Sequence, residues 1–217
     1  MTIQEIYEEA AARAKALGFE TPVPVYLAGP EVFLPDAVAI GLAKKRICAA
    51  HGLDGLFPFD NEVDVSQFTP EEAGVEISRK NEALMDRASA IIANVTPWHG
   101  GPSLDVGTGF EIGYMRALRK PLFLYSNDGR SFYQRVRAHF GDDVYTDAQG
   151  HTRARADDTS IENFGGMRDN LMFDGAVISA KGVFIAATKP DVYRDLDLFT
   201  QLVQKAASHF YTRPQLA

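Results

Sequence analysis

The feature that most constrains this chain is a regular alternation of short apolar runs with segments of helical pattern. Four runs rich in β-branched, aromatic and aliphatic residues are expected to be strands, at residues 23–30, 53–59, 90–97 and 121–128. The runs at 90–97 and 121–128 are continuously apolar at their centres, which is typical of strands buried on both faces. The connections between runs are long enough for helices, so the pattern predicts parallel strands joined by helical crossovers.

The segments between these runs show the spacing and the end signals of helices. Thr69, for example, precedes a proline and two acidic residues, which is typical of a helix N-terminus. The expected helices cover residues 3–17, 37–52, 69–89, 104–120 and about 190–209. Residues 176–185 are expected to form a last strand or strand pair, and residues 129–170 an irregular insertion with a short helix within 130–140. The chain is therefore predicted to be one domain over residues 1–217, an open doubly wound, flavodoxin-like α/β sheet of about five strands.

Composition narrows the class of partner. Lys and Arg number 22 against 29 Asp and Glu, a formal charge of −7, which argues against nucleic acid because such binding depends on cationic surface. The single cysteine, Cys48, allows neither an internal disulfide nor a cysteine metal cluster. The acidic, amphipathic N-terminus is unlike a signal peptide, and no apolar run approaches the ~20 residues that span a bilayer. We expect a cytoplasmic protein that acts on small molecules and needs no metal or organic cofactor.

The segment over residues 94–121 carries the strongest chemical signal. It passes from a buried strand through a glycine-rich loop into a helix, with Asp105 at the helix start and Glu111 in the apolar run VGTGFEIGYM. A carboxylate among apolar side chains is costly unless it has partners or a task. Six residues rotate a helix by about 600°, so both carboxylates can serve one ligand only if Asp105 points over the helix end. The alternative is that Asp105 is a simple cap and Glu111 pairs with Arg116 or Lys120.

Four ordered motifs resemble the nucleoside 2-deoxyribosyltransferase family. They are VYLAGPEVF, NEALMDRASAIIANVTP, DVGTGFEIGYMRALRKP and DNLMFDGAV, within roughly residues 23–128 and 162–185. The resemblance implies that Glu111 is the nucleophile and that Asp105 exchanges a proton with the leaving base. It also implies that Asn170 and Met172 complete the site of a neighbouring subunit, so that the protein is a homo-oligomer with shared sites. Phe33, after the turn at Gly29, would pack against the base.

One position departs from the pattern of many bacterial members of this family. These members carry an aspartate where Asn81 aligns, which leaves the role of Asn81 and the preference for purine or pyrimidine bases open. Trp98, in the loop after the third run, is expected either to line the base pocket or to pack over the loop. One of Asp60, Asn61 and Glu62, or of Asn127 and Asp128, is a further candidate for substrate contact because these residues end strands.

The implied chemistry suits these side chains. A 2-deoxyribosyl C1′ develops oxocarbenium character, and an adjacent carboxylate can stabilise it and trap it as an ester. A second acid protonates the departing base, and another base then enters instead of water. Two alternatives remain at this point: an N-glycoside hydrolase of nucleoside 5′-monophosphates, and a nucleoside-binding module without catalysis.

Overall fold

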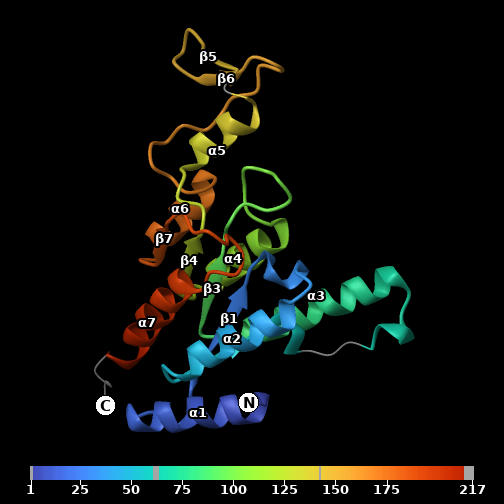
Figure 1. Ribbon diagram of the computed structural model, residues 1–217, viewed down its shortest axis with the longest axis vertical. Coiled ribbons are helices and arrows are strands. Elements are labelled where there is room, and N and C mark those ends of the chain that lie inside the picture. Colours follow the sequence, from blue (N-terminus) through green and yellow to red (C-terminus); the bar gives the residue numbers. More distant parts are fainter. Residues whose placement is uncertain (1, 61–63, 142, 213–217) are drawn as a thin grey trace.

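The computed structural model describes residues 2–60, 64–141 and 143–212, and its centre is a parallel five-stranded sheet (Figure 1). The strand order is β2-β1-β3-β4-β7, and every neighbouring pair is parallel. The strands are β1 (Val23–Ala28), β2 (Leu53–Leu56), β3 (Ala90–Asn94), β4 (Leu122–Ser126) and β7 (Val183–Ala186). This order is that of doubly wound, flavodoxin-like sheets, so the predicted fold class is confirmed.

Helices cover both faces of the sheet. The helices α3 (Pro70–Arg87), α4 (Val106–Ala117) and α6 (Leu171–Ser179) contribute to the core on one face, and α2 (Ala37–Ala49) and α7 (Asp197–Tyr211) to the core on the other. The helix α1 (Ile3–Ala16) packs beside α2 through Ile6 and Ala10, which contact Ala49 and Leu42. Short 3-10 turns lie at Pro30–Phe33, Pro58–Asp60 and Val65–Gln67.

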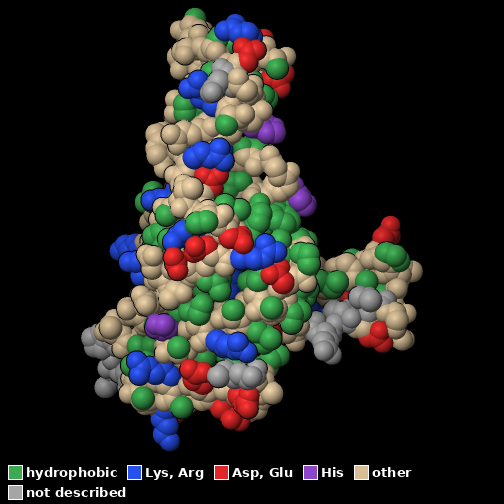
Figure 2. Space-filling model, in the orientation of Figure 1, with side chains coloured by type: hydrophobic (Ala, Val, Ile, Leu, Met, Phe, Trp, Pro, Cys, Tyr) green, Lys and Arg blue, Asp and Glu red, His purple; other side chains and the backbone are tan. Residues whose placement is uncertain are grey.

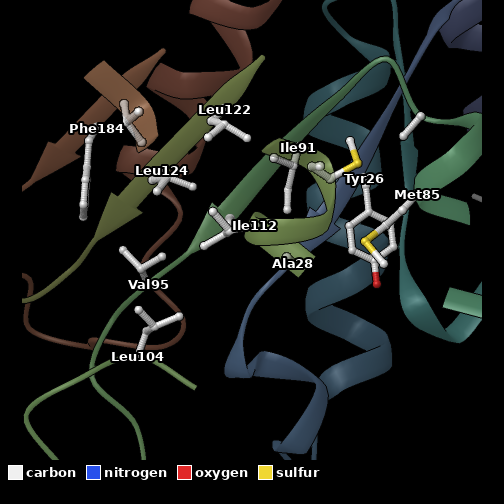
Figure 3. Close-up of a cluster of buried hydrophobic side chains, with 14 of the residues drawn as sticks. Tyr26, Ala28, Met85, Ile91, Val95, Leu104, Ile112, Leu122, Leu124 and Phe184 are labelled. Carbon is white, nitrogen blue, oxygen red and sulfur yellow. The ribbon is translucent and has the colours of Figure 1, made fainter. Parts of the chain in front are cut away.

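Alternation along the strands divides the apolar residues between the two cores. In β1, Val25 and Leu27 face the α2 and α7 side, whereas Tyr26 and Ala28 face the α3 and α4 side. Figure 3 shows the second set, with Tyr26 close to Met85 of α3 and Ile112 of α4 among the cluster. The strands therefore read as continuous apolar runs because both of their faces are covered.

The insertion projects from the body of the protein. It holds α5 (Phe132–His139) and a two-stranded antiparallel hairpin of β5 (Val144–Thr146) and β6 (Thr152–Ala154), which form a small apolar cluster with Ile161. In Figures 1 and 2 this arm extends from one end of the molecule, and part of α3 extends from its side. The short helix of the insertion was predicted and the hairpin was not.

Two predicted elements near the C-terminus are present but begin later in the sequence than predicted. Residues 171–179 form the helix α6, so the last strand is confined to Val183–Ala186. The side chain of Asn170 caps this helix by accepting from the amide of Met172 at 3.1 Å. The last helix begins at Asp197 instead of Asp191, because Asp191 accepts from the amides of Tyr193 and Arg194 in a turn.

Candidate active site

Glu111 lies on α4 with its carboxylate directed at the sheet. It is three residues from Thr108 and four from Met115, which are both buried, so helical spacing places it at the edge of the buried face. The hydroxyl of Tyr26, a residue of β1 that is fully buried, donates to Glu111 Oε1 at 2.5 Å. Glu111 pairs with neither Arg116 nor Lys120, so this part of the alternative interpretation is wrong for the described residues.

The environment of Glu111 changes its acidity. Burial raises the pKa of Glu111 to about 7, the hydrogen bond from Tyr26 opposes this rise, and the charge of Asp105 adds to it. Burial and the adjacent carboxylate also raise the pKa of Tyr26 far above its usual value, so the phenol remains a hydrogen-bond donor. Glu111 therefore titrates near neutral pH, as a carboxylate with a chemical role often does.

Asp105 is the N-cap of α4 and also acts on Glu111. Its Oδ2 accepts from the amide of Thr108 at 2.9 Å and from the Thr108 hydroxyl at 3.2 Å. Among the described residues, Oδ1 accepts no hydrogen bond from the protein. Asp105 is thus a cap, as the alternative interpretation predicted, and it is also close enough to raise the pKa of Glu111.

A groove between α3 and α4 gives access to Glu111. Its volume is about 360 Å³. The residues that line it are Gly74, Ile77, Ser78, Asn81, Glu82, Met85, Gly107, Phe110 and Glu111. The structure therefore brings Asn81 and Glu111 to one groove, and the lining contains two acids and no Lys or Arg.

The turn after β1 requires glycine at position 29. Gly29 has φ 150°, and a Cβ there would lie 2.1 Å from Glu31 Oε2 and 2.8 Å from Asn94 Cβ. Glu31 is itself buried and bonded to Lys44 at 2.5 Å, Asn94 at 2.9 Å and the Tyr125 hydroxyl at 3.0 Å. Gly29 thus shapes the carboxyl edge of β1 through this polar cluster.

Phe33 and Trp98 meet beyond the ends of β1 and β3. Their rings stack at a centroid distance of 5.7 Å and an angle of 23°, and the Trp98 ring meets Tyr193 edge-on at 5.0 Å. Phe33 remains 58% exposed, which leaves apolar ring surface open at the carboxyl edge. The Trp98 ring thus packs against Phe33 and Tyr193, and neither Phe33 nor Trp98 lines the groove around Glu111.

Asn170 and Met172 stand apart from the Glu111 groove of their own chain. Asn170 caps α6, and its Nδ2 donates to Glu162 at 2.6 Å. Met172 is 68% exposed. The two residues are not among those that line the groove, so the structure does not assemble all predicted site residues within one chain.

The other strand-end candidates have structural partners. Asp60 pairs with Lys45 and accepts from the amide of Phe57, and Asn61 and Glu62 lie outside the described residues. Asn127 donates to the carbonyls of Val192 and Asp195 at 2.9 and 3.0 Å. Asp128 pairs with Arg130 at 2.7 Å.

Two further observations concern the surface and possible metal ligands. Within residues 2–60, 64–141 and 143–212, no cluster of three or more His, Cys, Asp or Glu has the arrangement of a metal site, and no helix has the length and apolar character to span a bilayer. Acidic and basic side chains are interspersed on the face drawn in Figure 2.

Sequence reasoning missed Tyr26. The signal was available, because Tyr26 carries the one polar side-chain group in the strand VPVYLA, but nothing in the sequence pairs it with a residue 85 positions away. Fold and geometry together define a doubly wound α/β protein in which Glu111, with Asp105 nearby, lies at a groove between α3 and α4.

Comparison with known proteins identifies the family. A family model described as nucleoside 2-deoxyribosyltransferase matches residues 25–172. An uncharacterized protein of Schizosaccharomyces pombe is 34% identical over 170 residues, which cover 75% of this chain and 80% of that protein. This chain belongs to the nucleoside 2-deoxyribosyltransferase family.

Solved structures are similar as well. A 2-desoxiribosyltransferase from Leishmania mexicana is 28% identical with a TM-score of 0.55, over 84% of this chain and 98% of that one. A 2-deoxyribosyltransferase from Bacillus psychrosaccharolyticus is 20% identical with a TM-score of 0.42, over 50% of this chain and 75% of that one. Family and fold together indicate an enzyme of the deoxyribosyltransferase type.

Proposed function

We propose that this protein exchanges the nucleobases of 2′-deoxynucleosides through a glycosyl ester on Glu111. The observation that carries the proposal is the Glu111 carboxylate, held by Tyr26 at 2.5 Å beside an open groove. With Oε1 engaged by the phenol, Oε2 is the oxygen that attacks C1′. A carboxylate with a pKa of about 7 is substantially ionised at neutral pH and can act as this nucleophile.

The reaction balances with two carboxylates and no further reagent. The first half starts with Glu111 ionised and the one proton of the carboxylate pair on Asp105; the C1′–N bond breaks, the Glu111–C1′ ester forms, and the departing base takes that proton from Asp105. In the second half, a nitrogen of the incoming base attacks C1′, the ester breaks, and the base returns its proton to Asp105. Asn81, which lines the same groove as Glu111, is proposed to hydrogen-bond the substrate.

The charges around the groove favour a nucleoside over a nucleotide. Glu82 and Glu111 line it, Asp105 lies nearby, and no Lys or Arg is among the lining residues. A 5′-phosphate in this groove would meet like charges without a compensating cation, which costs binding free energy. This supports the transferase over a hydrolase of nucleoside monophosphates.

A second copy of the chain is proposed to complete each site. Large apolar side chains are exposed on α4 and α6, namely Val106, Phe110, Met172 and Ile178, at 88%, 57%, 68% and 71%. Exposed apolar surface of this kind is often covered at interfaces between proteins. Covering it would exclude water from the ester and would allow Asn170 and Met172 to reach a neighbouring groove.

Base exchange tests the chemistry directly. Incubation with deoxyinosine and free adenine should yield deoxyadenosine, and a panel of base pairs with deoxy and ribo donors should define the preference. Absence of exchange with every pair while the protein is folded would refute the proposal. Release of free base from a nucleoside monophosphate, without transfer, would favour the hydrolase instead.

A mixing experiment tests the shared site. Glu111→Gln and Asn170→Ala should each be inactive alone, but hybrids contain a site with Glu111 from one subunit and Asn170 from the other. For a dimer that mixes at random, about a quarter of wild-type activity should return. No recovery after verified subunit exchange, or a monomeric mass by light scattering, would contradict the shared site.

A further inference from the structure

Arg135 of the insertion connects three segments of the chain. Its side chain is buried, and all of its guanidinium nitrogens donate to the protein. Nε donates to the carbonyl of Pro102 at 2.7 Å, and the two terminal nitrogens donate to the carbonyls of Arg130 at 2.8 Å and Arg168 at 2.5 Å. A planar group with fixed donors holds such segments in a defined relative position.

Asp169 continues this connection toward the proposed catalytic residues. It is fully buried and pairs with Arg135 at 3.0 Å. Its Oδ1 accepts from the Ser103 hydroxyl at 2.5 Å and from the amide of Asn170 at 2.8 Å. The Asp169 carboxylate therefore holds Ser103, two residues before Asp105, and also Asn170, the residue that follows Asp169 in the sequence.

From these contacts we infer that Arg135 and Asp169 are positioning residues that set Asp105 and Asn170 relative to each other. The inference rests on the proposed function. In a complex with shared sites, Asp105 serves the groove of its own chain and Asn170 serves that of the neighbour. The pair would thus link two active sites, and it would give the inserted helix α5 a part in the reaction without contact with substrate.

The first test measures mobility and requires no activity. In hydrogen–deuterium exchange on the full-length protein, Arg135→Met should raise the exchange of residues 102–108 and 168–173 together. Arg155→Met is the matched control, because it removes the same charge from the same insertion, where Arg155 forms an exposed pair with Asp143 at 3.2 Å. The control should leave both segments unchanged.

The second test is kinetic. A shift of about 1 Å in a catalytic group can cost on the order of 100-fold in rate, so Arg135→Met should lower kcat by about 10- to 100-fold with little change in KM for the base. The share of donor hydrolysed instead of transferred should rise. That share does not depend on how much of the protein is folded, so a merely structural role would leave it unchanged.

Milder variants keep the test valid if Arg135→Met does not fold. Asp169→Asn retains the shape but loses the charge, and Ser103→Ala removes a single hydrogen bond to Asp169. Each should raise the hydrolysed share and lower kcat, with the smaller effect in Ser103→Ala. Arg135→Lys keeps the charge without the planar fork and should recover only part of the lost rate.

The outcomes separate the two proposals. Absence of base exchange in the wild type would refute the proposed function. The hydrogen–deuterium exchange result would then decide by itself whether Arg135 and Asp169 hold the two segments together. Wild-type kcat and hydrolysed share in a folded Arg135→Met protein would overturn the inference. An increase in hydrogen–deuterium exchange confined to residues 102–108 or to residues 168–173 would overturn it as well.

Discussion

Replacing Tyr26 with phenylalanine removes one hydroxyl from the site and leaves the shape of the buried ring unchanged. The hydroxyl donates to Glu111 Oε1 at 2.5 Å, and this bond opposes the rise in the pKa of Glu111 that burial causes. In the variant, burial and the charge of Asp105 act without that opposition. The pKa of Glu111 should therefore rise above its present value of about 7.

The size of the effect follows from the free energy of the bond. A hydrogen bond to a charged group contributes about 1.5–3 kcal/mol, and about 1.4 kcal/mol corresponds to one pKa unit. The pKa of Glu111 should thus rise by about 1 to 2 units. At pH 7 the ionised fraction would fall from about one half to roughly 1–10%, so exchange should slow by about 5- to 50-fold.

The assay is the pH dependence of kcat/KM for base exchange between pH 5 and 10. The wild type should lose activity below about pH 7 as Glu111 is protonated. In Tyr26→Phe the midpoint of this loss should move to higher pH, and most of the rate should return by about pH 9 to 10. An unchanged midpoint, or a rate loss equal at every pH, would refute the reasoning.

Four further substitutions test other parts of the structure. Glu111→Gln should abolish base exchange. Because the pKa of Glu111 in the folded protein, about 7, exceeds the reference value of 4.5, the free energy of unfolding of the wild type should fall as the pH rises between these two values, whereas that of the variant should not. Urea unfolding should therefore show the variant gaining roughly 3 kcal/mol relative to the wild type from pH 4 to pH 8. Asp105→Asn should keep the helix cap, so its free energy of unfolding should lie within about 0.5 kcal/mol of the wild-type value, but kcat should fall by about 100-fold. Equal losses of stability and rate would contradict a catalytic role for Asp105. Gly29→Ala should destabilise the protein by about 1–3 kcal/mol because the new Cβ would overlap Glu31 and Asn94. Gly113→Ala has open space at its Cβ and should stabilise the protein by up to about 1 kcal/mol. Similar melting temperatures for the two glycine variants would contradict the steric argument.

The predicted elements succeeded or failed for identifiable reasons. The strand over residues 90–97 and the helix from Thr69 were predicted correctly because burial on both faces and a capping box leave clear local patterns. The end of α6, residues 176–179, was mistaken for the start of a strand because a short apolar run has no periodicity that separates the two structures. Only the fold shows that Asn170 caps this helix. Only the fold shows, too, that Asp174 is buried and accepts from the amides of Arg168 and Asp169 at 2.9 and 3.1 Å.

The order of strands and helices, and the six-residue spacing of Asp105 and Glu111, are properties of the linear chain. Alternation, capping residues and a helix face depend on near neighbours, so the sequence alone determined the fold class and the two carboxylates. The tertiary structure decided what those carboxylates meet. It brings Tyr26 to Glu111 across 85 residues and Arg135 to Asp169 across 34, and it leaves Asn170 outside the groove of its own chain. Such contacts arise from packing between distant segments, for which the local pattern of residues contains no signal.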